Sequence, residues 1–217
     1  MDKGPRNDRW YLRLMAPNTK GGKFAWLDPT SIYINGAAFR DLLDDLCADL
    51  EGVEADVVAG LDAMGFVLGA ALAARWGVGF LPVRKAGKLC VYTDSVSFTN
   101  YSGRTQRMEI RLPAFAPGTR VLLADQWVET GGTMAGAIDL IERQHGCVTG
   151  LAAIAIETAP RTVRFRETYR CASAVLPGSR WQRECDAQFL SSFTHYRPED
   201  AFPASLRSGF PRPHDGL

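Results

Sequence analysis

The segment 125–133, Asp-Gln-Trp-Val-Glu-Thr-Gly-Gly-Thr, contains residue types that can bind a sugar monophosphate. An apolar run at 121–124 precedes it and an amphipathic stretch begins at Met134, so the order is buried strand, acid, loop and helix. The two glycines let the backbone approach a phosphate closely, while the threonine hydroxyls and the free N–H groups at the helix start bind its oxygens. The helix dipole also favours an anion there. Asp125, one loop upstream, is placed to accept hydrogen bonds from ribose hydroxyls.

A simpler interpretation of these residues is an acid-ended strand whose Gly-Gly turn caps an ordinary helix. The complete order of apolar run, acid, loop, Thr-Gly-Gly-Thr and helix is too specific for that interpretation to be preferred. The segment is not a Walker loop, because no lysine follows the glycines. It also lacks the glycine spacing of the dinucleotide-binding fingerprint.

A second group of candidate residues lies between positions 60 and 90. Arg84, Lys85 and Lys88 follow an apolar stretch and supply positive charge. The loop 61–65, Leu-Asp-Ala-Met-Gly, would present backbone N–H groups from a tight turn and a helix start. Taken alone, three basic residues are more often a solvated surface than an anion site.

Two strand-helix-strand units position these segments. The expected elements are strands at 56–59, 79–84, 121–124 and 148–156, and helices at 37–50, 65–76 and 133–145. Apolar strands that alternate with helices indicate an α/β fold, in which helices flank a parallel sheet and ligands gather at the carboxyl ends of the strands. All the candidate segments lie at such ends.

The composition indicates a single globular domain spanning residues 1–217, with 46% hydrophobic and 23% charged residues. A net charge of +1 gives no reason to expect nucleic acid as a partner, and no apolar run approaches membrane-spanning length. The five cysteines are scattered without a Cys-x-x-Cys pair, which argues against a zinc site and favours a reducing compartment. The polar N-terminus does not resemble a signal peptide, so we expect a cytoplasmic protein with a mobile tail at 1–8.

Three segments together resemble the type I phosphoribosyltransferases, and most closely the adenine phosphoribosyltransferase branch. The segment 125–133 resembles the motif that binds phosphoribosyl pyrophosphate (PRPP), 59–69 resembles the pyrophosphate loop, and 83–89 resembles the basic segment. The similarity runs from about residue 24 to 157. It implies the type I phosphoribosyltransferase fold, with a small hood and a flexible loop. It also implies transfer of the 5-phosphoribosyl group of PRPP, carried with Mg²⁺, to a purine or purine-like base, as in purine salvage, by a homodimer.

The resemblance assigns a role to each candidate residue. PRPP and its 5′-phosphate would be bound by Asp125, Gln126, Glu129, Thr130, Gly131, Gly132 and Thr133. The pyrophosphate would be bound by Asp62, Ala63, Arg84, Lys85 and Lys88. The base would contact Trp26 and Leu27, although an aromatic residue near a strand start is as often part of the core. Glu129 and Asp125 would act in catalysis.

The chain departs from the family pattern at several of these positions. Met64 stands where an arginine usually contacts pyrophosphate, and a core-filling role is the preferred interpretation of this methionine. Gln126 replaces the second acid of an Asp-Asp pair, and Leu27 replaces an arginine of the hood. Glu129 stands where adenine enzymes carry alanine and the hypoxanthine-guanine branch carries an aspartate near purine N7. A carboxylate there either takes a proton from the base or is a solvent-facing loop acid.

The polar segment 87–112 is either a solvated surface hairpin or, by resemblance, the flexible loop that closes over substrate. Within it, the stretch 98–104, Phe-Thr-Asn-Tyr-Ser-Gly-Arg, has no acid where the adenine family carries a loop glutamate. Glu109 is nearby but matches a structural position in the following strand. Base activation is therefore either taken over by Glu129 or different from that of the family.

Two functions remain in view. The first is the phosphoribosyltransferase reaction, and the alternative is a non-catalytic regulatory protein that binds PRPP or a nucleotide on the same fold. Asp125 and the Thr-Gly-Gly-Thr turn favour the enzyme, whereas Met64, Gln126 and the absent loop glutamate favour the regulator. The aromatic residues after position 169 would lie either beside the base pocket or at a dimer contact.

Overall fold

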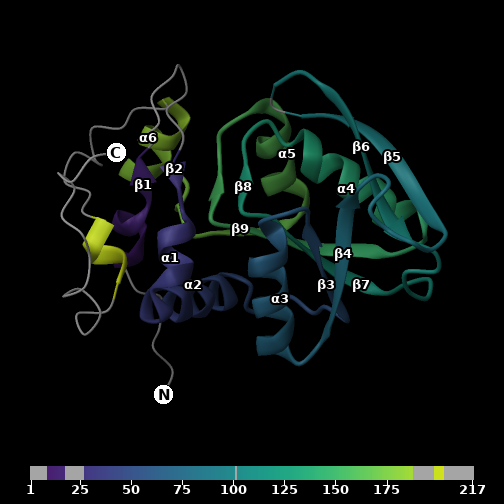
Figure 1. The fold of residues 1–217 in the computed structure, drawn as a ribbon, viewed down its shortest axis with the longest axis horizontal. Helices are drawn as coiled ribbons and strands as arrows, with labels where there is room; N and C mark the ends of the chain where they lie inside the picture. The colour runs from purple at the N-terminus through teal and green to yellow at the C-terminus, as the bar shows by residue number, and fades with distance from the viewer. Residues whose placement is uncertain (1–8, 18–26, 101, 188–197, 203–217) are drawn as a thin grey trace.

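The computed structural model describes residues 9–17, 27–100, 102–187 and 198–202. Its centre is a seven-stranded sheet with the order β11-β9-β7-β3-β4-β6-β5 (Figure 1). The strands are β3 (Val57–Leu61), β4 (Gly79–Lys85), β5 (Thr93–Thr99), β6 (Thr105–Arg111), β7 (Arg120–Ala124), β9 (Cys147–Ala153) and β11 (Arg170–Ser173). The pairs from β11 to β4 are parallel, and β6 pairs antiparallel with both β4 and β5. This mostly parallel sheet confirms the expected fold class.

Helices cover both faces of the sheet (Figure 1). They are α1 (Thr30–Ile34), α2 (Gly36–Asp49), α3 (Gly65–Trp76), α4 (Gly132–Arg143), α5 (Pro160–Thr168) and α6 (Arg180–Ala187), with 3-10 helices η1 (Trp10–Leu14) and η3 (Pro198–Ala201). Two small strand pairs lie outside the main sheet: β1 (Ala16–Pro17) with β2 (Leu27–Asp28), and β8 (Trp127–Val128) with β10 (Ala155–Ile156). Within the described ranges, none of the helices combines the length and apolarity needed to cross a membrane.

The side-chain alternation of β7 divides the interior into two cores. Leu122 and Ala124 pack in a cluster with residues of α2 and α3, while Val121 and Leu123 pack with residues of α4 and β6 on the other face. Such a strand is apolar along its whole length because successive side chains enter opposite cores. This is why the uninterrupted run before Asp125 indicated a central strand.

The expected helices agree with α2, α3 and α4 to within two residues at each end. The single strand expected at 148–156 is instead two strands, since β9 ends at Ala153 and β10 pairs separately with β8. At the break, the Ile154 N–H donates to the Gln126 carbonyl at 3.1 Å, outside the main ladder. The residues on both sides of the break are buried and apolar, so no polar residue in the sequence marked it.

The segment 87–112 forms the antiparallel hairpin of β5 and β6, which packs along α4. Arg143 of α4 donates to the carboxylate of Asp94 at 2.9 Å and so joins the helix to the start of β5. Glu109 is buried, and its carboxylate accepts the backbone N–H groups of Lys88 and Leu89 at 2.8 and 2.9 Å. These contacts support the structural role expected of Glu109. Tyr101 lies outside the described residues.

Candidate active site

A cavity of about 270 Å³, here called the central cavity, lies at the carboxyl ends of β3, β4 and β7. It is lined by five residues predicted from the sequence, Asp62, Arg84, Lys85, Asp125 and Thr133, and by Leu61, Val83, Phe98, Asn100, Gln106, Met108 and Trp127. Parallel strands that are neighbours in a sheet end at the same edge, so three segments distant in sequence meet here. The hairpin supplies the remaining wall.

Asp125 lies directly after β7, where the surrounding protein raises the pKa of its carboxyl to about 7. Burial is the main cause, and a hydrogen bond of 2.7 Å from the Gln126 N–H partly offsets it. The start of α3 packs against this strand end, because a Cβ atom on Gly65 would lie 2.6 Å from the Ala124 carbonyl oxygen and 3.1 Å from the Asp125 Cα. The absence of a side chain at Gly65 therefore lets the 61–65 loop lie beside the acid.

The 61–65 loop and the end of β4 form an ion pair on the wall of the central cavity. Arg84 Nε donates to Asp62 Oδ2 at 3.1 Å, and the backbone N–H of Lys85 reaches the same oxygen at 3.4 Å. The guanidinium also lies 5.8 Å from the centroid of the Phe66 ring. Asp62 thus orients Arg84 and offsets its charge. The exposed Lys85 ammonium has no side-chain partner among the described residues and is the less compensated cation of the cavity.

Two residues of the expected pyrophosphate site, and the neighbouring Met64, lie away from the central cavity lining. Ala63 is exposed beside Asp62, and the peptide bond between them is cis. Lys88 is exposed in the β4–β5 connection, where its backbone N–H is bonded to Glu109. Met64 is half-buried at the N-cap of α3 and belongs to neither core cluster of the described residues. The structure therefore gives no support to the core-filling role expected of this methionine.

The Thr-Gly-Gly-Thr turn is held between two other elements. Gly131 has a φ of 77° and is the N-cap of α4, a left-handed conformation that favours glycine. A Cβ atom on Gly131 would lie 2.9 Å from the Phe165 ring of α5, and one on Gly132 would overlap the Thr99 carbonyl oxygen of the hairpin. The glycines are thus required by close packing on both sides, in addition to the phosphate approach inferred from the sequence.

Trp127 and Glu157 form a hydrogen-bonded pair that the sequence analysis missed. Trp127 lines the central cavity, and its indole N–H donates to Glu157 Oε1 at 2.6 Å. The pKa of Glu157 is raised to about 7, mainly by burial. The hydrogen bond from the Trp127 indole lowers this pKa, and the negative charges of Glu129 and Asp186 raise it further. The parallel pairing of β8 with β10 brings the two segments together. The signal available in the sequence was an aromatic residue two positions after Asp125.

Glu129, Gln126 and Leu27 do not line the central cavity. Glu129 is half-buried, and burial raises its pKa. The Gln126 side chain turns towards α1, where its amide donates to the Tyr33 hydroxyl at 3.4 Å. Leu27 packs against the α2–α3 core from β2. Trp26 lies outside the described residues, so its contact with a base stays a prediction.

Comparison with known proteins agrees with this arrangement. The phosphoribosyl transferase domain model matches residues 30–185. The adenine phosphoribosyltransferase of Chloroflexus aurantiacus is 43% identical over 125 residues, which cover 58% of this chain and 72% of the relative. That of Brevibacillus brevis is 37% identical over 142 residues, covering 65% and 82%.

Solved structures give the same result. The crystal structure of adenine phosphoribosyltransferase from Thermoanaerobacter pseudethanolicus superposes with a TM-score of 0.69 at 32% identity, covering 75% of this chain and 95% of that one. The Saccharomyces cerevisiae enzyme, solved with adenine and an imino-altritol bisphosphate, gives a TM-score of 0.63 at 28% identity, covering 75% and 96%. The chain therefore belongs to the phosphoribosyl transferase family and is a type I phosphoribosyltransferase similar to the adenine phosphoribosyltransferases.

Proposed function

We propose that the protein transfers the 5-phosphoribosyl group of PRPP to a purine base, with adenine as the first candidate, and releases pyrophosphate. The observation that carries this proposal is the central cavity, in which Asp62, Arg84 and Lys85 face Asp125 and Thr133. One end offers cations and N–H groups suited to pyrophosphate. The other offers an acid suited to ribose and a helix start suited to the 5′-phosphate.

In the reaction, the bond between the anomeric carbon and the pyrophosphate oxygen breaks, and a ring nitrogen of the base bonds to that carbon and loses its proton. Lys85 and Arg84 neutralise the leaving group, and Asp125 lies where positive charge develops on the sugar. At neutral pH the carboxyl of Asp125 is partly protonated because of burial. Positive charge beside it favours the ionised form, which stabilises the sugar cation.

The hairpin closes one wall of the central cavity through Phe98, Asn100, Gln106 and Met108. By enclosing the cavity on that side they limit the access of water to the reacting carbon, which favours transfer to the base over hydrolysis. Glu129 is our candidate for accepting the proton of the base. Burial raises the pKa of Glu129, which makes its carboxylate a stronger proton acceptor, and Glu129 lies near enough to Glu157 to raise the pKa of that group too.

Mg²⁺ would enter with PRPP. Among the described residues, no cluster of three or more His, Cys, Asp or Glu side chains could hold a metal ion. Asp62 and Asp125 nevertheless place two carboxylates on the cavity wall, a set suited to a Mg²⁺ ion that keeps waters and substrate phosphates as its other ligands. The metal would supply charge neutralisation of the pyrophosphate. We also propose that the protein is a homodimer and is located in the cytoplasm. Light scattering on the purified protein tests the homodimer.

The decisive experiment incubates the protein with PRPP, Mg²⁺ and a panel of purines and pyrimidines, and measures pyrophosphate release. Release with adenine or another purine supports the proposal. No release with any base, together with measurable binding of PRPP or AMP, would instead support the regulatory alternative, which the half-buried Met64 and the Gln126 amide turned towards Tyr33 favour.

A further inference from the structure

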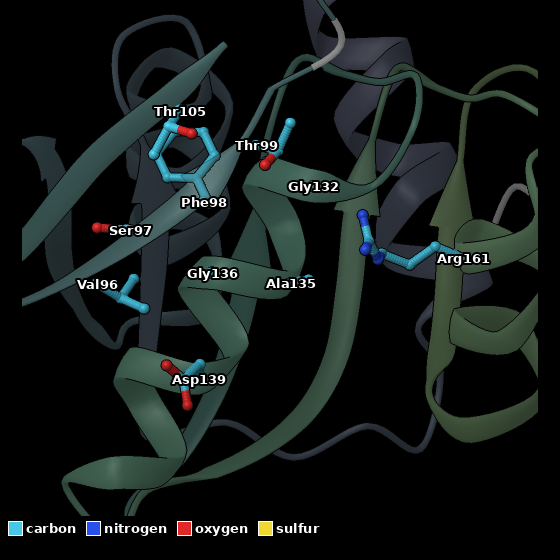
Figure 2. A pocket seen from close by; sticks show the side chains of 10 residues that line it. All are labelled: Val96, Ser97, Phe98, Thr99, Thr105, Gly132, Ala135, Gly136, Asp139 and Arg161. Atoms are coloured by element: carbon cyan, nitrogen blue, oxygen red, sulfur yellow. The ribbon is translucent and has the colours of Figure 1, made fainter. Parts of the chain in front are cut away.

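Arg161 lies over the Thr-Gly-Gly-Thr turn, in a position that the sequence analysis did not single out. Glycine has no Cβ atom, but one added to Gly131 would lie 3.3 Å from both Cγ and Cδ of Arg161. A Cβ atom added to Gly132 would lie 3.6 Å from Nη1 of Arg161. Figure 2 shows the side chain extending from α5 towards the first turns of α4, with its nitrogens nearest that helix. Arg161 and Gly132 both line a cavity of about 400 Å³, here called the outer cavity.

The position of Arg161 is fixed by the packing of α5. Phe165, one helical turn later, is buried, and its ring lies against Gly131. The start of α5 is held by the Ala159 N–H, which donates to Thr162 Oγ1 at 2.9 Å. Because Arg161 and Phe165 share one helix face, the contact that anchors α5 on the turn also directs the guanidinium over it.

The charge of Arg161 is uncompensated in the described part of the chain, where its guanidinium has neither a hydrogen bond nor an ion pair. Asp139, the acid lining the outer cavity, faces Arg143 at 3.9 Å instead. The Thr99 carbonyl oxygen lies on the other side of Gly132 and would oppose an anion there, so any attraction must come from the guanidinium and the helix start. A cation beside a helix start is suited to an incoming anion.

We propose that Arg161 is a binding residue for the 5′-phosphate, supplying a charge-assisted hydrogen bond beside the backbone N–H groups of the turn; this inference rests on the proposed function of that turn. The ligand class is a ribose carrying a 5′-phosphate, whether as PRPP, as the nucleotide product or as ribose 5-phosphate. The guanidinium fork matches the geometry of phosphate oxygens.

The test measures ribose 5-phosphate binding by calorimetry with the wild type, Arg161→Gln and Arg161→Lys. Arg164→Gln is the matched control, because Arg164 is exposed on the same helix and lines neither cavity. We expect Arg161→Gln to weaken ribose 5-phosphate about tenfold at low salt and less at high salt, since the side chain is exposed. Arg161→Lys should keep part of the affinity, and Arg164→Gln should change it less than about twofold. Adenine binding, which involves no phosphate, should be the same in all variants.

Equal affinity for ribose 5-phosphate in the wild type and Arg161→Gln would overturn the inference, as would an equal loss in Arg164→Gln. Failure of the wild type to bind ribose 5-phosphate would overturn it as well. A selective loss in Arg161→Gln, in a protein that transfers phosphoribosyl to no base, would support the inference while refuting the proposed activity. The two proposals can therefore fail separately.

Discussion

Replacing Asp125 by asparagine should stabilise the protein while removing its activity. The carboxyl has an ordinary pKa of 3.8 in the unfolded chain and one of about 7 in the folded protein. The folded state therefore keeps a proton that the unfolded state has released. The stabilisation from this group is fully present below pH 3.8 and is lost as pH rises to about 7. At pH 8 the native protein contains a poorly solvated carboxylate.

The size of the effect follows from the two pKa values. Each unit of pKa is worth about 1.4 kcal/mol, so the change from 3.8 to about 7 corresponds to at most about 4 kcal/mol. Asp125 borders the central cavity, where water screens it, so we expect about 1–3 kcal/mol. Asparagine is uncharged and can still accept the 2.7 Å hydrogen bond from the Gln126 N–H.

Urea unfolding of the wild type and Asp125→Asn at pH 4.5 and pH 8 measures this difference. The variant should be more stable by about 1–3 kcal/mol at pH 8 and by a small fraction of that at pH 4.5. Glu157 also titrates near neutral pH, but it is present in both proteins and cancels in the comparison. Asp139→Asn, a substitution of an exposed acid on α4, serves as the control and should change stability by less than about 0.5 kcal/mol at either pH. No gain at pH 8, or the same gain at both values, would refute the reasoning.

Four further substitutions test the site. Gly132→Val should abolish AMP binding, measured by calorimetry, while the protein stays folded, because the new side chain overlaps the Thr99 carbonyl; unchanged affinity would exclude this turn as the 5′-phosphate site. Lys88→Ala should weaken PRPP more than AMP, since AMP lacks the pyrophosphate, and Lys85→Ala should do so more strongly because Lys85 lines the central cavity; equal losses for both ligands would contradict a pyrophosphate role. Glu129→Gln should lower turnover at least about tenfold with PRPP affinity near normal, and unaffected turnover would mark Glu129 as a loop acid.

The parts of the fold that could be predicted are those whose signal is local. The apolar run before Asp125 and the helical pattern of 65–76 identified β7 and α3, because each element buries side chains with its own period. The sequence left open whether the hairpin is solvated or packed, because its packing on α4 involves the contact between Asp94 and Arg143, which are 49 positions apart. Polar composition alone does not distinguish a docked hairpin from a solvated one.

The difference between local signals and long-range contacts also explains which site residues were placed correctly. Asp125 and Trp127 are two positions apart and both line the central cavity, whereas Gln126 between them turns to Tyr33. Gln126 lies at a bend between the end of β7 and the start of β8, where its side chain leaves the cavity, so its family role does not follow from its adjacency to Asp125. Glu157 lies beside Trp127 because β8 pairs with β10, and no local sequence pattern predicts that pairing.

The Gly131–Gly132 turn also couples two walls that would otherwise be independent. The hairpin contacts it through Thr99, and α5 contacts it through Phe165 and Arg161. A side chain added at Gly132 displaces the hairpin, and the same hairpin lines the central cavity beyond Thr99, so the steric effect extends towards the pyrophosphate end. Removing the charge of Arg161 leaves that packing unchanged. Gly132→Val should therefore weaken both PRPP and ribose 5-phosphate and lower turnover, whereas Arg161→Gln should weaken both ligands with little change in turnover at saturating PRPP. If both variants lowered turnover at saturating PRPP to the same extent, the separation of the steric effect at Gly132 from the charge effect at Arg161 would be refuted.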